Sequence, residues 1–538
     1  MTGKKEPTDK EKPKDKEKEK ESWDEVEEEP KDKEDDGKII ESYETESDNV
    51  KTEVNILEKD FIPYYQLVTP DVDVATYALL DDVKERLIGA MEISSSEAFD
   101  PKLMEDLKEK FRENARTLLT EELPDLDDDI KENFIVNLIH ELLGLGNIEF
   151  LLDDEHIEEI VINSAKEPIR IYHKKYGWLQ TNLVPESEMQ IVNYANTIGR
   201  RVGREITSLN PLLDAHLVTK DRVNAVLTPI STKGSTITIR KFARDPWTVT
   251  DFIKNKTISS EVSALIWLAI QYEMNILISG GTGSGKTSFL NVCMPFIPPS
   301  HRIISIEDTR ELQLPKFLYW CPLTTREPNP EGKGEVSMLD LVVNSLRMRP
   351  DRIIMGEIRK QREAEVLFEA MHTGHSVYGT LHADTCAQTI TRLTNPPINI
   401  PESMLDSVHL NIVMFRDRRK GLRRTYEVGE FTPTLDANRK LRFDPKLIYK
   451  WNPKRDTIDL LVKPEEIALY EKIGSHTGYD LKEIQEELGM KKKILEWLLK
   501  NNIRQVDDVG KIFNRYYVDT DTVIKVVNRK GDPKELLE

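Results

Sequence analysis

The sequence predicts an α/β protein built around a parallel β-sheet with helices on both of its faces. Two observations predict this class. From residue 248 onward, short apolar runs alternate with helical patterns, which is typical of parallel sheets. The first apolar run also leads directly into a glycine-rich loop, Gly280–Thr287, that opens a helix. The predicted strands of this sheet are Asn275–Ser279, Ile303–Ile306, Arg352–Met355 and Val377–Thr380.

The part of the chain before this sheet divides into three regions. Residues 1–50 are rich in Lys, Glu and Asp and almost free of apolar residues, which predicts a disordered charged tail; a docking or regulatory arm is the alternative. Residues 51–143 carry apolar residues three and four positions apart, which predicts a helical N-terminal domain. Residues 144–242 contain short β-type runs between turn residues, which predicts a small α+β domain. The predicted helices are Ala75–Met91, Lys102–Leu119 and Ile130–Leu143, and the predicted strands are Ile157–Ile162, Ile169–Tyr172, Arg222–Leu227 and Ser235–Ile239.

The sheet domain is expected to span residues 243–431 and to be followed by a C-terminal extension over 432–538. The extension has a mixed pattern that becomes helical toward its end. Its predicted helices are Pro464–Ile473, Asp480–Leu488, Lys491–Asn501 and Asp519–Asn528.

Composition narrows the functional classes. The formal net charge of −20 over 538 residues disfavours a general nucleic-acid binder, because such affinity comes mainly from neutralising phosphates. Only three cysteines occur, far apart and without a CxxC pair, so neither a disulfide framework nor a structural zinc site is expected, and a reducing cytoplasm is the natural compartment. No apolar run approaches the length of a membrane span, so any work at a membrane is expected from the water side.

The glycine-rich loop carries the strongest chemical signal. It reads G-x-x-x-x-G-K-[ST] between a strand and a helix, which is the setting that a phosphate-binding loop requires. Lys286 is expected to reach the β- and γ-phosphates of ATP, and the Thr287 hydroxyl to ligate Mg²⁺. The remaining loop residues are expected to bind phosphate oxygens through their backbone N–H groups: Gly280, Gly281, Thr282, Gly283, Ser284 and Gly285.

Hydrolysis also requires a carboxylate near the γ-phosphate, and two predicted strands end in one. The strand at Ile303–Ile306 is followed by Glu307, and the strand at Arg352–Met355 is followed by Gly356 and Glu357. Ligands bind beyond the carboxyl ends of parallel strands, so both acids are expected to face the loop. We expect Glu357 to be the catalytic carboxylate and Glu307 to be a second acid near metal or water.

Three histidines follow in the segment 369–383. His372, His375 and His382 lack the cysteine or carboxylate partners of a metal site, which argues against metal ligation. The predicted strand Val377–Thr380 brings His382 to the sheet edge, where its imidazole is suited to contact the γ-phosphate or its water. A capping or core histidine is the alternative.

These elements together resemble the type II/type IV secretion and pilus-assembly ATPase family. The stretches that carry the resemblance are, in order, the phosphate loop, an acidic segment, a Gly-Glu strand end and a histidine segment: Gly280–Thr287, Ile303–Leu312, Leu346–Arg359 and Ala370–Ala383. The resemblance extends upstream to about residue 140. It implies a RecA-like P-loop ATPase domain preceded by a PAS-like α+β domain, in a ring of six copies.

The resemblance also implies that arginines from the PAS-like domain close onto the phosphates. Arg240 and Arg222 match those positions, with Arg204 as a weaker third, although Asp221 stands where the family usually has glycine. The chain lacks the four-cysteine zinc insert of many bacterial members, and its helical N-terminal region and its C-terminal extension are more similar to the archaeal branch, which serves pili or the archaellum.

A basic cluster between 416 and 424 completes the set of candidates. It is interpreted as a charged β-hairpin turn around Gly421, and contact with a membrane platform protein or anionic headgroups is the alternative.

The predicted function is therefore a hexameric motor at the cytoplasmic face of the membrane. It is expected to hydrolyse Mg-ATP and to drive assembly or secretion of type IV pilin-like subunits through an integral-membrane platform protein. Two alternatives stay open: a nucleic-acid-translocating ATPase on the same core, which the acidic charge disfavours, and a nucleotide-gated scaffold with little turnover.

Overall fold

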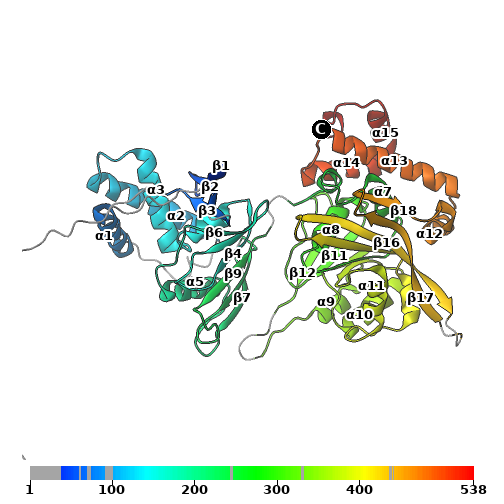
Figure 1. Ribbon diagram of the computed structural model, residues 1–538, viewed down its shortest axis with the longest axis horizontal. Coiled ribbons are helices and arrows are strands. Elements are labelled where there is room, and N and C mark those ends of the chain that lie inside the picture. The colour runs from blue at the N-terminus through cyan, green and yellow to red at the C-terminus, as the bar shows by residue number, and fades with distance from the viewer. Residues whose placement is uncertain are drawn as a thin grey trace, which may run out of the picture.

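The chain folds around two β-sheets of nine strands each, which lie in two separate bodies in the computed structural model (Figure 1). The structure describes residues 38–59, 62–69, 74–90, 101–217, 219–242, 246–326, 328, 332–435, 439 and 441–537. The charged residues before position 38, which make up most of the predicted tail 1–50, therefore lie outside the described residues.

The first sheet has the strand order β1-β2-β3-β6-β5-β4-β9-β8-β7. All of its neighbouring strands are antiparallel except β3 and β6. The strands are β1 (Lys38–Ser47), β2 (Val50–Lys59), β3 (Ile62–Leu67), β4 (Ile157–Ile162), β5 (Arg170–His173), β6 (Gly177–Thr181), β7 (Leu212–His216), β8 (Arg222–Val226) and β9 (Thr236–Arg240). The four strands predicted between 144 and 242 are thus confirmed as β4, β5, β8 and β9.

In the described part of the first body, three of the five helices form a bundle and two pack on the sheet. The helices are α1 (Val74–Ala90), α2 (Pro101–Glu122), α3 (Asp128–Leu143), α4 (Ile148–Asp153) and α5 (Glu188–Arg201). Helices α1 to α3 share one apolar core around Phe111 and Ile139, whereas α4 and α5 pack into the core of the sheet. The three predicted helices of this region are confirmed.

The boundaries predicted for the N-terminal regions are wrong. Strand β1 lies inside the predicted tail 1–50, and β2 and β3 lie inside the region predicted to be helical. The reason is visible in β2, where Val50, Thr52, Val54 and Ile56 are buried and the residues between them are mostly polar. This alternation of period two is the pattern of a half-buried strand, and the surrounding charge obscured it.

The second sheet has the strand order β12-β11-β13-β14-β10-β15-β16-β17-β18. The first six strands in this order are parallel, and the last three run antiparallel to their neighbours. The strands are β10 (Ile276–Gly280), β11 (Arg302–Glu307), β12 (Tyr319–Thr324), β13 (Arg352–Met355), β14 (Ser376–Leu381), β15 (Leu410–Asp417), β16 (Leu422–Leu435), β17 (Leu441–Asn452) and β18 (Thr457–Leu460). The predicted parallel sheet and its four predicted strands are confirmed.

Helices cover both faces of this sheet, as the α/β class requires. Ile276 and Ile278 of β10 belong to one apolar core, and Leu277 between them belongs to the core on the other face. The helices of this part are α6 (Val249–Lys254), α7 (Ser260–Gln271), α8 (Lys286–Cys293), α9 (Met338–Ser345), α10 (Gln361–His372) and α11 (Cys386–Thr394), with single turns η2 (Met294–Phe296) and η3 (Glu402–Ser407).

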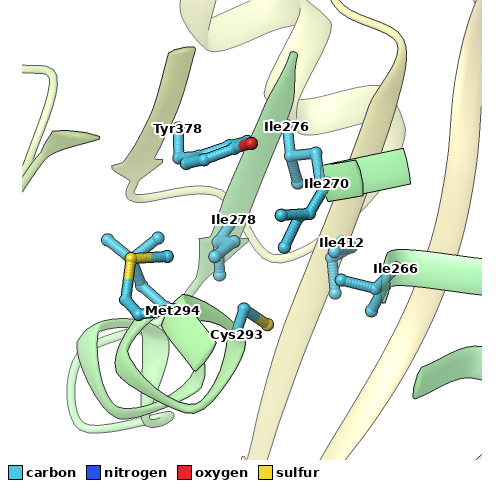
Figure 2. A pocket seen from close by; sticks show the side chains of 9 residues that line it. Ile266, Ile270, Ile276, Ile278, Cys293, Met294, Tyr378 and Ile412 are labelled. Carbon is cyan, nitrogen blue, oxygen red and sulfur yellow. The ribbon is translucent and has the colours of Figure 1, made fainter. Parts of the chain in front are cut away.

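The core beneath the glycine-rich loop is closely packed. Figure 2 shows Ile278 of β10 with Cys293 at the end of α8, Met294 at the start of η2 and Ile266 of α7, around a small cavity of about 10 Å³. Its lining is wholly apolar, and its volume is at most that of a single water molecule. The strand and helix that hold the loop are therefore fixed by apolar contacts from below.

The C-terminal segment belongs to the second body, which corrects the predicted boundary at 431/432. That boundary falls within β16, and β17 and β18 extend the same sheet. The last helices are α12 (Ala468–Thr477), α13 (Leu481–Lys500), α14 (Val506–Val518), α15 (Thr520–Asn528) and α16 (Lys534–Leu537), after the turn η4 (Pro464–Glu466). They pack on α7 through Trp267, whose ring meets Phe513 and Tyr516 edge-on. Two predicted helices, Asp480–Leu488 and Lys491–Asn501, form the single helix α13, and α14 was not predicted.

Among the described residues, no helix is both long enough and apolar enough to cross a membrane.

Candidate active site

The glycine-rich loop joins β10 to α8 at the carboxyl edge of the second sheet. Gly283 and Gly285 have φ angles of +70° and +92°, and Gly280 has +150°, a backbone region that side-chain-bearing residues rarely adopt. A Cβ at Gly280 would also lie 2.5 Å from the Met414 carbonyl oxygen. Such a loop followed by a helix N-terminus has the geometry of an anion-binding site.

Lys286 begins α8 and folds back over the loop. Its side chain is buried, with Nζ donating to the carbonyl oxygens of Gly280 at 2.9 Å and Gly281 at 3.1 Å. Its third neighbour is Nδ1 of His382, at 3.3 Å. The lysine is therefore held directly above the loop.

His382 connects Lys286 to Glu357. It follows β14, and its Nε2 lies 3.2 Å from Oε1 of Glu357, which follows β13. An ammonium group can only donate and an ionised carboxylate can only accept, so the imidazole accepts at Nδ1 and donates its proton from Nε2. The histidine is thus neutral, with one defined tautomer.

Two further charged groups continue this chain of contacts. Arg359 donates from Nη2 to Oε2 of Glu357 at 2.8 Å, and its Nη1 hydrogen-bonds the carboxylate of Asp308. Asp308 follows β11, so three adjacent strands, β14, β13 and β11, place His382, Glu357 and Asp308 along one sheet edge. This arrangement is the one expected for ligand sites in parallel sheets.

The electrostatics of these groups are consistent with their contacts. Burial lowers the pKa of Lys286, against the opposing charges of Glu357, Asp384 and Glu311. Burial and the nearby lysine lower the pKa of His382, which keeps the imidazole neutral at pH 7. Burial alone would raise the pKa of Glu357, but the hydrogen bond and charge of Arg359 bring it below its usual value. At neutral pH the site therefore holds an ionised carboxylate beside a neutral imidazole.

Glu307 has a different environment from the one predicted. It is 2% exposed, and its Oε1 accepts from the backbone N–H groups of Glu311 at 2.9 Å and Leu312 at 3.1 Å. Burial raises its pKa to about 7. Its other oxygen, Oε2, is buried without a hydrogen-bond partner among the described residues. Half of this carboxylate thus orders the backbone after β11, and half is left unsatisfied.

The donor set suits a magnesium ion. Thr287 lies in the first turn of α8, and Mg²⁺ prefers hard oxygen ligands such as hydroxyls, carboxylates and phosphates. The unpartnered Oε2 of Glu307 is a buried oxygen of this kind. Within the described residues, no group of three or more His, Cys, Asp and Glu side chains forms a protein-only metal site. His372 and His375 instead contact Asp406 and Thr373.

The arginines predicted from the first body lie at its boundary with the second. Arg240, at the end of β9, is 66% exposed, and its Nη1 lies 3.4 Å from Oε1 of Glu311. Arg222 of β8 makes a two-point contact with Asp214, with distances of 3.1 and 2.6 Å. Arg204 donates to the Asp214 carbonyl oxygen at 2.6 Å. Of these three arginines, Arg240 is the one with a direct contact to the second body among the described residues.

Two members of the basic cluster, Arg416 and Arg423, flank the loop, a position that was not predicted for them from the sequence. Nε of Arg423 lies 3.3 Å from the Gly283 carbonyl oxygen, and a Cβ at Gly283 would meet Nη1 of Arg416 at 2.6 Å. The predicted hairpin itself is confirmed, since β15 pairs with β16 around residues 418–421. The signal that could have placed these arginines is the length of β15. This strand lies beside β10 and continues past the point where the loop begins, so its last residues lie next to the loop.

Sequence comparisons give the family. Residues 160–416 match the family described as type II/IV secretion system protein. An uncharacterized protein of Methanocaldococcus jannaschii is 37% identical over 396 residues, covering 72% of this chain and 70% of that protein. Another uncharacterized protein of the same organism is 36% identical over 272 residues, covering 49% of this chain and 96% of its own. The type IV secretion system protein PtlH of Bordetella pertussis is 30% identical over 302 residues, covering 50% and 88%.

Two solved structures are also similar. The VirB11 ATPase of the Brucella suis type IV secretion system, in complex with sulphate, is 26% identical with a TM-score of 0.27, covering 52% of this chain and 90% of its own. The Legionella pneumophila ATPase DotB is 18% identical with a TM-score of 0.37, covering 71% and 94%. The family assignment rests on the sequence identities, which confirm the resemblance found in the motifs. This chain belongs to the type II/IV secretion system protein family.

Proposed function

We propose that this chain is an ATPase that hydrolyses Mg-ATP at the loop Gly280–Thr287. The observation that carries the proposal is the contact chain from Lys286 through His382 to Glu357. It places a cation for phosphate, a neutral imidazole and an ionised carboxylate side by side at the edge of a parallel sheet. This is the set of groups that phosphoryl transfer to water requires.

Each group has a defined task. The loop and Lys286 bind the β- and γ-phosphates, and Glu357 accepts a hydrogen bond from the attacking water and orients it. His382 donates to Glu357 and fixes the carboxylate, which leaves its other lone pairs for water. Thr287 would hold Mg²⁺ together with the phosphates, and the bound ion would neutralise charge that develops on them. Glu307, with one unsatisfied oxygen, is a further candidate for this ion or its waters.

The first body supplies a means to couple hydrolysis to motion. Arg240 is largely exposed and contacts Glu311, one of the carboxylates whose charge acts on Lys286. A guanidinium that exchanges Glu311 for the γ-phosphate stabilises transition-state charge only when the two bodies approach. Arg222 would have to leave Asp214 to take part in the same way.

We further propose that the chain works as a ring of six copies at the cytoplasmic face of a membrane. The family assignment supports a role in moving protein subunits, and we propose type IV pilin-like cargo and an integral-membrane platform protein as the partner. Magnesium-dependent turnover, hexamer formation and binding to a coexpressed platform protein are separate consequences, and each can be measured without the others.

The test is steady-state ATPase activity of the full chain against protein concentration, with molar mass measured in parallel. Lys286→Ala, Glu357→Gln and Arg240→Ala are compared with two controls. Lys482→Ala removes the same charge at an exposed position, and Arg455→Ala removes an arginine whose 67% exposure is similar to the 66% of Arg240. We expect specific activity to rise as a six-fold mass appears and the three site variants to lose most of it. Activity that is unaffected by Lys286→Ala and Glu357→Gln would refute the proposed site, and activity independent of assembly would refute the ring.

A further inference from the structure

The hairpin formed by β15 and β16 extends past the sheet and over the phosphate loop. β15 pairs in parallel with β10, and the last partners are Gly280 and Met414. Residues after Met414 therefore leave the sheet at the same edge and in the same direction as the loop itself. Arg416 lies two positions beyond Met414 on β15, and it is directly opposite Arg423 of β16.

Both guanidinium groups reach Gly283, in the middle of the loop. Arg423 donates from Nε to the Gly283 carbonyl oxygen at 3.3 Å. Arg416 lies so close that a methyl group at Gly283 would be 2.6 Å from its Nη1. Both side chains are half-buried, whereas Arg418 and Arg419 on the turn are exposed. The two arginines thus belong to the wall of the site and not to the outer surface of the hairpin.

The charges of these two guanidinium groups are not balanced by a contacting carboxylate in the part of the chain that the structure describes. Among the described residues, neither Arg416 nor Arg423 forms an ion pair, although Arg424, the next residue, is buried against Asp456 with contacts of 2.7 and 3.0 Å. Like charges directly opposite on neighbouring strands repel each other. Two half-buried guanidinium groups at a phosphate loop are suited to share one anion, because the planar group binds phosphate oxygens in pairs.

We propose that Arg416 and Arg423 bind the phosphate groups of the nucleotide on the loop, and that Arg416 gives up a contact with the first body to do so. This inference rests on the proposed function and adds two ligands from the hairpin. In the present structure, Nη2 of Arg416 donates to the hydroxyl of Tyr172 at 2.7 Å. Tyr172 lies in β5, so the bond links the hairpin of one body to the sheet of the other.

The competing anion is a membrane headgroup. A headgroup would be met by the exposed turn, where Arg418, Arg419 and Lys420 project from the hairpin. Arg416 and Arg423 lie behind this turn and against the loop, which favours the nucleotide as their ligand. The two anion sources therefore predict different sensitive residues: the inner pair for nucleotide, and the turn for membrane.

The experiment measures equilibrium binding of a fluorescent ADP to the full chain. Arg416→Gln and Arg423→Gln are compared with wild type and with the turn variants Arg418→Gln and Arg419→Gln. We expect each inner variant to weaken ADP binding about tenfold, since a charge-assisted hydrogen bond contributes on that scale, and each turn variant to bind within about twofold of wild type. Arg416→Lys, which keeps the charge, is expected to recover part of the affinity and guards against misfolding as the cause.

Tyr172→Phe tests whether the hydrogen bond between Arg416 and Tyr172 competes with phosphate binding. If Arg416 must leave Tyr172 to reach a phosphate, removing the hydroxyl makes ADP binding equal to or tighter than in wild type; weaker binding would contradict the exchange. Normal ADP affinity in both inner variants would overturn the inference. If those variants with normal ADP affinity also lose binding to anionic phospholipid vesicles, the ligand of the two arginines is a membrane headgroup. If wild type itself binds no nucleotide, the proposed function fails instead. If wild type binds ADP and Lys286→Ala does not, the proposed site stands whatever the inner variants show.

Discussion

The two bodies differ in what the charged groups of the candidate site contact. In the second body, Lys286, His382 and Glu357 already contact one another, and adjacent strands of one sheet hold them in place. In the first body, Arg240 and Arg222 are paired with the carboxylates of Glu311 and Asp214. In the proposed function, the groups that bind phosphate are thus already in place within one body, whereas the arginines that would stabilise charge across the boundary must first exchange partners.

The largest effect is expected from removing Lys286, the cation that already lies at the phosphate loop. Lys286→Ala is expected to weaken ATP and ADP binding by about 100-fold, because a charge-assisted contact to phosphate contributes up to about 3 kcal/mol. Turnover should fall further still. Calorimetric titration with both nucleotides checks this, with Lys482→Ala as the control. Nucleotide affinity close to wild type would mean that the site is elsewhere.

Removing the boundary arginine should act on turnover and leave ground-state binding largely intact. Arg240→Ala is expected to lower kcat about 100-fold, the scale of losing one transition-state donor, with ADP affinity changed less than about threefold. Kinetics with a binding titration on the same sample separate the two effects. Arg455→Ala, with the same charge and a similar exposure, is the control. Equal losses in kcat and in ADP affinity would mean that Arg240 already binds the nucleotide in the ground state, as Lys286 is proposed to do.

The imidazole between lysine and carboxylate can be tested by pH. Because the pKa of His382 is lowered, the neutral ring persists at pH 7 and is lost only on acidification, below its ordinary value of 6.5. His382→Gln should reduce turnover about fivefold to tenfold at pH 7, the scale of one hydrogen bond, and should flatten the acid limb of the pH profile. His372→Gln, which alters an exposed histidine paired with Asp406, should leave the profile unchanged.

The last expected effect concerns Glu307 and the free energy of unfolding. Burial raises its pKa from 4.5 to about 7, so the folded protein holds a proton that the unfolded chain releases. This contribution, on the order of 3 kcal/mol, is complete below about pH 4.5 and is lost as pH rises through 7. Glu307→Gln keeps an oxygen for the two backbone donors and removes the titration. Thermal unfolding is measured for both proteins at pH 5 and pH 8. Wild type should lose more stability between these two pH values than Glu307→Gln does, and an equal loss in both proteins would contradict the raised pKa of Glu307.

Much of the second body could be predicted because its signals are local. An apolar strand, a glycine-rich loop and acids at strand ends fix the sheet edge, so Lys286, His382 and Glu357 could be placed together from the sequence. The contacts that sequence analysis missed join residues far apart. Arg423 and Gly283 are 140 positions apart, and no pattern in either segment indicates the other.

Two other failures have physical causes. Strands β1 and β2 were missed because a charge-rich composition dominated the interpretation, although alternate residues of β2, such as Val54 and Ile56, are buried. The environment of Glu307 could not be predicted because its Oε1 depends on the path of the chain after β11, where it meets the amides of Glu311 and Leu312. Strand ends place a carboxylate at the edge of a sheet, but loop geometry decides what it contacts.

The most direct test of the central claim is phosphate release by Glu357→Gln, measured with nucleotide affinity in the same preparation. The account predicts that turnover falls about 100-fold or more while ATP and ADP bind nearly as in wild type, because the amide cannot accept the proton but the loop and Lys286 are intact. Turnover within about threefold of wild type, with normal binding, would contradict Glu357 as the catalytic carboxylate. It would leave this chain a nucleotide-binding member of its family whose catalytic group lies elsewhere.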